Sequence, residues 1–228
     1  MGHAIEEIAL ERGHEVVLKI NIDNTDDFTE QNLRYADVAI EFTGPESAFE
    51  NVMKCLDAGV ATVCGSTGWL ADYEKVVEVC NKMHGSFLYA SNFSVGVNLF
   101  FELNIFLAKL MERQKDYNVI LEEIHHTQKK DAPSGTAITL AEQVLEVITS
   151  KKHWVNHLSD NLEELEIISE RTGNVPGTHT VKYFSAVDDI EIIHTAHNRK
   201  GFAMGAVLAA EFICSKKGIF SMKDVLGL

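Results

Sequence analysis

The sequence predicts an α/β protein with a doubly wound parallel sheet and a second, α+β unit built on a mixed sheet. Over the first ninety residues, short β-branched runs alternate with amphipathic helical segments, as in a parallel sheet covered by helices. From residue 94 the pattern changes to a long apolar helix followed by strand-like runs and further helices. The 228 residues are 46% apolar, which allows one large or two modest hydrophobic cores.

Four runs in the first part have the β-branched, apolar character of strands that are buried in a parallel sheet. They cover residues 15–20, 38–42, 60–64 and 87–90. Parallel strands joined by helices bind their ligands at the carboxyl ends of the strands. We therefore expect a ligand site at that edge of the first sheet.

The segments between these runs carry helix signals. Pro45 occupies a first helical position, apolar side chains then follow at i, i+4 and i+8, and Gly59 stands just past the end. Another helix is predicted over residues 71–83. Residues 1–10 are also helical in pattern and are closed by Gly13.

The chain opens directly on that helix. A dinucleotide-binding sheet needs a strand and a Gly-rich turn before it, and Gly2 has the place of the last glycine of a G-x-G-x-x-G turn. We expect the first strand and most of the turn to be missing from this sequence, so that the chain as written binds a dinucleotide weakly or not at all. The alternative is an ordinary chain that begins with a helix.

The second part predicts a mixed sheet with helices on one face. Helices are expected over residues 97–111 and 135–148, and strands over 118–124, 165–169, 178–185 and 190–196. Residues 151–163 are polar and loop-like, and a helix over 204–214 ends the predicted fold. The expected domains are residues 1–93 plus 204–228, and residues 94–203.

Composition excludes several classes of protein. The net charge of −14 argues against nucleic acid and anionic membranes as partners. No apolar run approaches the roughly 20 residues of a membrane helix, and no secretory signal is present. The four cysteines lack zinc spacing and fit a reducing, cytoplasmic setting. Close histidine pairs occur without a cysteine or a nearby third ligand, so we expect no metal site.

The densest group of chemically active side chains lies between residues 123 and 137. His125 and His126 end a predicted strand and therefore point to opposite faces, which gives them different tasks. Histidine can give or take a proton near neutral pH, and Lys129 is a point cation for a carboxylate.

A Ser134-Gly135-Thr136 turn opens the helix that follows. Free N–H groups and the helix dipole favour an anion there, and Gly135 lets a ligand approach the backbone. With Arg171 and His179 as further sources of positive charge, the segment predicts a pocket for a small dicarboxylate with a proton donor. Taken singly, each group also has an ordinary structural interpretation. The histidine pair can be structural, Lys129 can be solvated, and Ser134 can be only a helix N-cap.

The run Glu123-Ile124-His125-His126, Lys129 and Asp131-Ala132-Pro133-Ser134-Gly135-Thr136-Ala137 resembles the signature of the dihydrodipicolinate reductases. These are NAD(P)H enzymes of the diaminopimelate route to lysine. Further segments resemble the same family over essentially the whole chain: residues 40–46, 65–68, 90–98, 171–173, 177–180 and, before the last helix, Arg199, Phe202, Ala203, Gly205 and Ala206.

The resemblance implies a Rossmann-like first domain, a second domain for substrate and oligomerisation, and a homotetramer in the cytoplasm. It implies reduction of 4-hydroxy-tetrahydrodipicolinate with NADH or NADPH. By similarity, His125 and Lys129 are catalytic. Substrate binding falls to His126, Ser134, Gly135, Thr136 and Arg171. Cofactor binding falls to Gly2, Asn21, Phe42, Thr43, Gly65, Ser66, Thr67, Ala90, Ser91, Asn92 and Phe93.

Asn21 departs from the expected pattern. An acidic residue is expected after the second strand of a dinucleotide fold to bind the ribose hydroxyls, whereas an amide binds them more weakly and repels a 2′-phosphate less. The choice between NADH and NADPH therefore stays open. Two other functions also stay open: a different two-domain nicotinamide oxidoreductase of amino-acid metabolism, and a non-catalytic ligand-binding protein.

Overall fold

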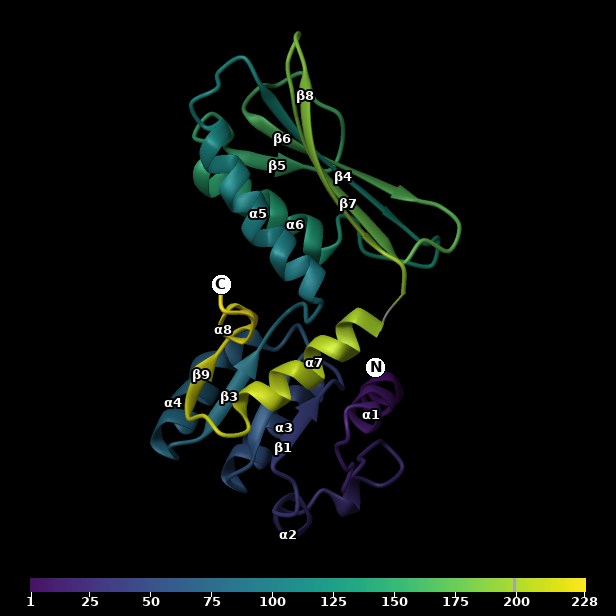
Figure 1. The fold of residues 1–228 in the computed structure, drawn as a ribbon, viewed down its shortest axis with the longest axis vertical. Coiled ribbons are helices and arrows are strands. Elements are labelled where there is room, and N and C mark those ends of the chain that lie inside the picture. Colours follow the sequence, from purple (N-terminus) through teal and green to yellow (C-terminus); the bar gives the residue numbers. More distant parts are fainter. Residues whose placement is uncertain (199) are drawn as a thin grey trace. The chain divides into compact units, whose positions relative to one another are not determined.

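The computed structural model describes residues 1–198 and 200–228 and divides the chain into two compact units (Figure 1). Unit 1 contains Met1–Val95 and Lys200–Leu228, and unit 2 contains Gly96–Arg199. The predicted boundaries, after residues 93 and 203, lie close to these. The assignment of cofactor to one unit and substrate to the other stays a prediction. Arg199, which belongs to the family resemblance, lies outside the described residues.

Unit 1 is built on a four-stranded parallel sheet in the order β1-β2-β3-β9. The strands are β1 (Val38–Glu41), β2 (Ala61–Cys64), β3 (Ser86–Tyr89) and β9 (Gly218–Phe220). The helices are α1 (Gly2–Glu11), α2 (Glu30–Leu33), α3 (Pro45–Asp57), α4 (Tyr73–Lys82), α7 (Lys200–Ile213) and α8 (Met222–Leu226), with short 3₁₀ turns at Thr25–Asp27 and Leu70–Asp72.

Helices cover both faces of this sheet because alternate residues of each buried strand point to opposite sides. In β2, Val63 packs in the cluster formed with α1 and α7, whereas Cys64 packs in the cluster formed with α3 and α4. All four residues of β2 are buried. The doubly wound parallel sheet that the sequence predicts is confirmed.

Two predictions for unit 1 are wrong. Residues 15–20 belong to no helix or strand, although Val16 and Leu18 are half-buried and Val17 is exposed. A strand requires a hydrogen-bonded neighbour, and the described residues provide none beside this segment. The fold also continues past the predicted last helix, since β9 pairs with β3 and α8 follows. Both elements are too short for a periodic signal.

Unit 2 is a five-stranded mixed sheet in the order β5-β6-β4-β7-β8. Its elements are α5 (Val95–Met111), β4 (Asn118–His125), α6 (Gly135–Val147), β5 (His153–Val155), β6 (Glu164–Arg171), β7 (Gly177–Phe184) and β8 (Asp189–Ala196). Strands β5, β6 and β4 run parallel, while β7 and β8 are antiparallel to their neighbours. The mixed sheet is as predicted, but β5 was expected to be loop. This edge strand is stabilised by pairing with β6 rather than by a pattern of its own.

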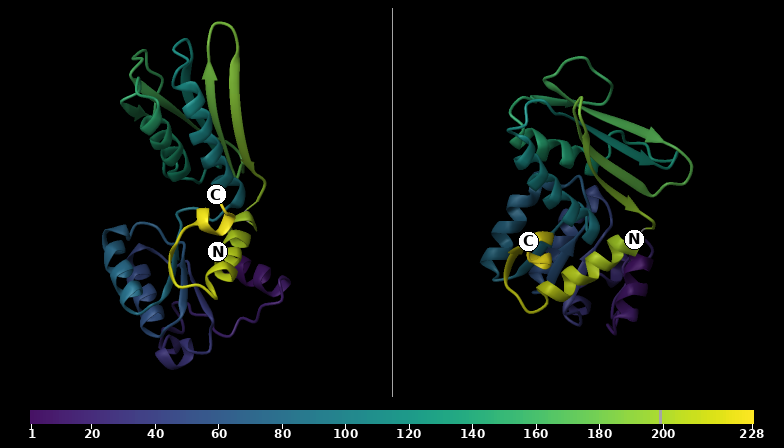
Figure 2. Two further views of the ribbon diagram at one scale, coloured as in Figure 1. Left: turned by 60° about the vertical axis from the view of Figure 1, so that its left-hand side comes forward. Right: turned by 45° about the horizontal axis from the view of Figure 1, so that its top comes forward.

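Helices α5 and α6 pack along one face of the unit 2 sheet (Figure 2). The core between them contains Leu121 of β4, Ile167 of β6 and Val181 of β7, which are neighbours in register. No described helix of either unit is long and apolar enough to cross a membrane.

Candidate active site

The face of the unit 2 sheet that packs on the helices changes from apolar to polar toward the end of β4. Because side chains alternate along a strand, Glu123 and His125 follow Leu121 on this buried face. The register places His179 of β7 and Ser169 of β6 on either side of Glu123. The strand pattern and pairing therefore assemble a buried polar row where the apolar core ends.

The carboxylate of Glu123 is the centre of this row. Its side chain is fully buried and accepts hydrogen bonds from the Ser169 hydroxyl (2.8 Å) and the Arg171 guanidinium (2.9 Å). Both carboxylate oxygens also accept from the backbone N–H of Ser134, at 3.1 and 3.2 Å. Burial by itself raises the pKa of Glu123, but these donors together with His125 outweigh it and hold the pKa well below its usual range.

Two imidazoles face this carboxylate. Nδ1 of His125 lies 3.3 Å from Glu123 Oε2, and Nε2 of His179 lies 3.7 Å from the same oxygen. The two rings meet edge to face with centroids 5.0 Å apart. Burial, followed by the charge of His125, lowers the pKa of His179 to about 4. The expectation that His179 adds positive charge is therefore wrong, because this histidine is neutral at pH 7.

Helix α6 begins directly at the polar row. The Ser134 hydroxyl accepts a hydrogen bond from the Ala137 N–H (3.2 Å), which makes Ser134 the N-cap, and it lies 3.1 Å from His179 Nε2. A side chain at Gly135 would meet no atom within 4 Å, so the start of the helix is open on that side. The N-terminal end of α6 thus combines an accessible backbone with the positive end of a helix dipole.

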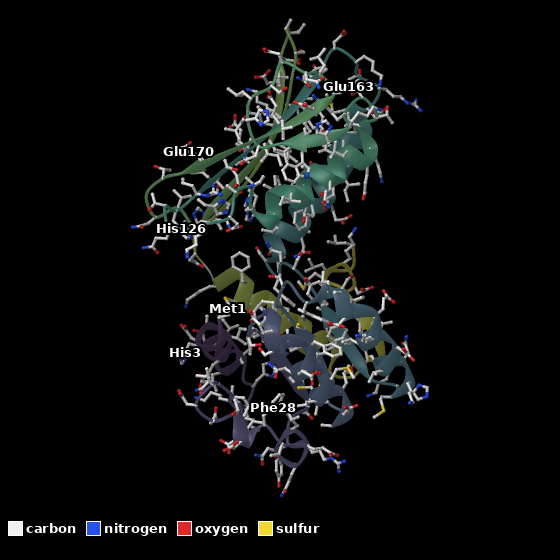
Figure 3. The ribbon with its side chains drawn as sticks, turned by 180° about the vertical axis from the view of Figure 1, so that it is seen from behind. Met1, His3, Phe28, His126, Glu163 and Glu170 are labelled. Atoms are coloured by element: carbon white, nitrogen blue, oxygen red, sulfur yellow. The ribbon has the colours of Figure 1, made fainter. Side chains whose placement is uncertain are left out.

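Lys129 and His126 follow β4 in the connection to α6. The ammonium of Lys129 pairs with both oxygens of Asp131 at 2.8 and 2.9 Å, and its backbone N–H donates to the carbonyl of His126. Lys129 is partly buried, whereas Asp131 is exposed. Burial acts to raise the pKa of Asp131, but the hydrogen bond from Lys129, a backbone hydrogen bond and the charge of Lys129 together outweigh burial and lower this pKa. Figure 3 shows His126 at the end of the sheet opposite to Glu163.

Arg171 makes several hydrogen bonds within the protein, whereas the sequence predicts only a source of positive charge. Besides Glu123, its guanidinium donates to the carbonyls of Asp131 (2.6 Å) and Glu170 (2.8 Å). Its Nε is buried without a partner among the described residues. These contacts tie the end of β6 to the loop that carries Lys129.

The predicted cofactor residues of unit 1 lie after the ends of adjacent strands. Phe42 and Thr43 follow β1, residues 65–67 follow β2, and residues 90–93 follow β3. The buried carboxylate of Glu41 accepts from the Thr43 N–H at 2.8 Å, which shapes the turn after β1. Residues 42–43, 65–67 and 90–93 therefore share the carboxyl edge where ligands of parallel sheets bind.

This edge fits a polar ligand with backbone contacts. A Cβ at Gly65 would overlap the ring of Phe42 at 2.2 Å, so only glycine allows this close approach. The Ser66 hydroxyl is buried without a partner among the described residues, and it is therefore available to a ligand. Gly2 and Asn21 are both exposed, and Asn21 Oδ1 accepts from the Asp23 N–H.

Sequence reasoning missed Glu123, Ser169 and Asp131 as members of the polar site. Glu123 carried a usable signal, since it stands two residues before His125 on a predicted strand and must share its face. Ser169 could be recognised only through the pairing of β4 with β6.

The spacing of Glu123, His125 and His179 would also suit a metal ion, since one ligand atom from each lies within 4.8 Å of the others. This cluster was not expected from sequence, because its members come from two strands. However, the carboxylate already accepts from Arg171, whose positive charge opposes a bound cation.

The parallel sheet with its ligand edge, and the polar row with imidazoles, an ammonium and a helix N-terminus, fit the class of two-domain nicotinamide oxidoreductases. The family comparison is more specific. Residues 1–93 match the family described as dihydrodipicolinate reductase, N-terminus, and residues 96–226 match dihydrodipicolinate reductase, C-terminus. The chain belongs to the dihydrodipicolinate reductase family.

Individual relatives agree. The chain is 52% identical over 228 residues to a 4-hydroxy-tetrahydrodipicolinate reductase of Christiangramia forsetii, covering 99% of this chain and 93% of the relative. It is 40% identical over 197 residues to the enzyme of that name from Methanosarcina acetivorans, covering 85% of this chain and 74% of the relative. A dipicolinate-bound dihydrodipicolinate reductase from Paenisporosarcina sp. TG-14 shares the fold, with a TM-score of 0.78 at 21% identity, covering 96% of this chain and 92% of that one.

Proposed function

We propose that this chain reduces 4-hydroxy-tetrahydrodipicolinate to tetrahydrodipicolinate with a nicotinamide cofactor, in the diaminopimelate route to lysine. The observation that carries the proposal is the polar row of unit 2, where His125 and Lys129 stand beside the N-terminal end of α6. A cyclic dicarboxylate needs an anion site and a proton donor, and this segment offers both. Family membership and the names of the relatives support the same reaction.

The substrate carboxylates are assigned to Lys129 and to the start of α6. The backbone at Gly135 and Thr136 offers N–H groups at the positive end of the helix, with His126 on the adjoining loop. Lys129 must exchange its contact with Asp131 for one with a carboxylate, or share the two. The dipicolinate held by the Paenisporosarcina protein is an aromatic dicarboxylate, which supports this class of ligand.

The cofactor is assigned to the carboxyl edge of the unit 1 sheet. Residues 42–43, 65–67 and 90–93 would hold it, with Gly2 and Asn21 as further contacts by similarity. When bound, NADH or NADPH supplies the hydride. The Ser66 hydroxyl and the close backbone at Gly65 are the features that fit it.

Proton transfer is assigned to His125, with Lys129 as a second donor. His125 can give a proton to the carbon next to the one that receives hydride, while water leaves the substrate ring. Its Nε2 faces Gly177, where a side chain would lie 3.0 Å away, so glycine keeps that nitrogen unobstructed by a Cβ. The role of the protein is to bind, orient and supply charge.

Assembly and location complete the proposal. We assign a homotetramer, formed through the unit 2 sheet, in the cytoplasm. Strand β8 is an edge strand whose Ile190 and Ile193 are exposed, which favours pairing or packing with another copy. The free state of all four cysteines fits a reducing compartment.

The test is oxidation of NADH and NADPH with substrate generated in the assay from pyruvate and aspartate semialdehyde. Lys129→Ala is compared with Lys130→Ala, an exposed neighbour that serves as the matched control. We expect kcat/KM to fall by roughly a hundredfold or more in Lys129→Ala, and to stay within about twofold in Lys130→Ala. Calorimetry with dipicolinate gives a second readout that requires no cofactor.

The reductase and its anion site are supported if the unmodified protein and Lys130→Ala oxidise either nucleotide and Lys129→Ala loses most of this activity. Folded protein that neither oxidises a nucleotide nor binds dipicolinate contradicts the proposal. Equal activity of both lysine variants contradicts the assignment of Lys129 while leaving the reaction in place.

A further inference from the structure

We propose that Glu123 is the positioning residue of this site: its buried carboxylate fixes the tautomer of His125 and holds the start of α6 against the sheet. This inference rests on the proposed function, since it explains how the proton donor and the anion site are kept together. It concerns a residue that touches neither substrate nor cofactor in that proposal and acts through His125 and Ser134.

Glu123 is built to stay charged. Its side chain is fully buried, which makes an ion costly, yet three groups donate hydrogen bonds to it: the side chains of Arg171 and Ser169 from β6, and the N–H of Ser134, the N-cap of α6. A buried carboxylate with such partners is more stable as the anion than as the acid, in agreement with its lowered pKa.

The charge of Glu123 determines which nitrogen of His125 carries the proton. Nδ1 of His125 is buried, lies 3.3 Å from Glu123 Oε2 and has no aligned hydrogen-bond partner among the described residues. A negative oxygen at this distance favours a proton on Nδ1. In the neutral ring, Nε2 is then the acceptor, and in the protonated ring Nε2 becomes the donor, next to Gly177.

The same carboxylate holds the anion site. Both oxygens accept from the Ser134 N–H, the first donor of the helix start, and the Ser134 hydroxyl contacts His179. Arg171 adds a tie to the Lys129 loop through the carbonyl of Asp131. Loss of the charge should therefore disturb the proton donor and the dicarboxylate site together.

The decisive measurement is nitrogen-15 NMR of the histidine rings, whose chemical shifts distinguish the two neutral tautomers. His125→Gln assigns the signal of His125. We expect the Nδ1–H tautomer in the unmodified protein and the Nε2–H tautomer in Glu123→Gln, because the amide can donate to Nδ1. Glu122→Gln, one residue earlier and exposed on the opposite face of β4, is the matched control and should leave the signal unchanged.

Kinetics and binding give the second readout. In Glu123→Gln we expect kcat to fall by roughly a hundredfold to ten-thousandfold, the range seen when a catalytic histidine is left in the wrong tautomer. Dipicolinate affinity should fall several-fold, and Glu122→Gln should match the unmodified protein in both.

Each outcome decides the proposal. An Nε2–H tautomer in the unmodified protein contradicts it even if Glu123→Gln fails to fold. An unchanged tautomer in folded Glu123→Gln also overturns it, as does a stoichiometric metal ion that is bound in the purified protein and lost from this variant. If the unmodified protein shows the expected tautomer but no reductase activity, the reaction fails while the positioning role stands.

Discussion

At the residue scale, His179 shows how burial converts a histidine from a charge into a neutral contact. Its Nε2 lies 3.1 Å from the Ser134 hydroxyl and 3.7 Å from a carboxylate oxygen of Glu123, yet burial and the neighbouring His125 lower its pKa to about 4. The unfolded chain, with a histidine pKa near 6.5, binds the proton more readily. Stability that depends on His179 is therefore complete above pH 6.5 and is lost as the pH falls toward 4.

We predict that His179→Gln is less sensitive to acid than the unmodified protein, because glutamine retains a polar contact with Ser134 but does not titrate. When the pH is lowered from 7.5 to 5, the free energy of unfolding should fall by about 2 kcal/mol less in the variant than in the unmodified protein. Urea denaturation at both pH values, followed by tryptophan fluorescence, measures this. An equal loss in both proteins contradicts the prediction.

At the element scale, helix α7 packs in the core of unit 1 and makes one especially close contact there. A Cβ at Gly205 would lie 1.7 Å from the carbonyl oxygen of Phe93, a backbone atom that cannot move aside like a flexible side chain. Gly201, one turn earlier in the same helix, has room: a Cβ there would meet only the Ser94 hydroxyl, at 3.6 Å. The small residue at 205 lets the helix pack against the loop after β3.

We predict that Gly205→Ala destabilises unit 1 by about 3 kcal/mol or more, because the clash forces the helix away from residues 90–93. Gly201→Ala should be neutral or slightly stabilising, since alanine favours the helix. Thermal denaturation of both variants gives the comparison. Similar melting temperatures for the two would show that α7 does not depend on this contact.

At the scale of the whole molecule, charge is the dominant feature. The chain carries 34 acidic and 20 basic side chains, and its net charge of −14 acts against the compact state by self-repulsion. The described ion pairs are mostly exposed, as in Lys75–Asp72 and Lys19–Glu6, so each contributes little. Screening of the excess negative charge should outweigh the weakening of these pairs.

We predict that raising NaCl from 10 to 300 mM increases the melting temperature by roughly 3 °C. Scanning calorimetry at constant pH measures the shift, and choline chloride controls for specific effects of sodium. A fall in melting temperature with both salts would mean that the ion pairs contribute more than self-repulsion.

Periodic patterns in the sequence predicted most elements because side chains on a buried face must recur at the period of the strand or helix. This holds for β1 to β3 in unit 1 and for β4 to β8, except β5, in unit 2. It fails for β5 and β9, which are three residues long, and for residues 15–20, where alternation occurs without a strand beside it. Strand pairing depends on two segments, so the pattern of one segment alone does not predict it.

By itself, the sequence determined the family resemblance, the alternating first part, the mixed sheet and the chemical types gathered between residues 123 and 137. Only the tertiary structure decided how those groups are charged and held. Glu123 stays an anion because β6 and α6 bring donors to it, and His179 is neutral because β7 buries its ring. Solvation and neighbouring charge depend on distance in space, which the order of residues along the chain does not specify.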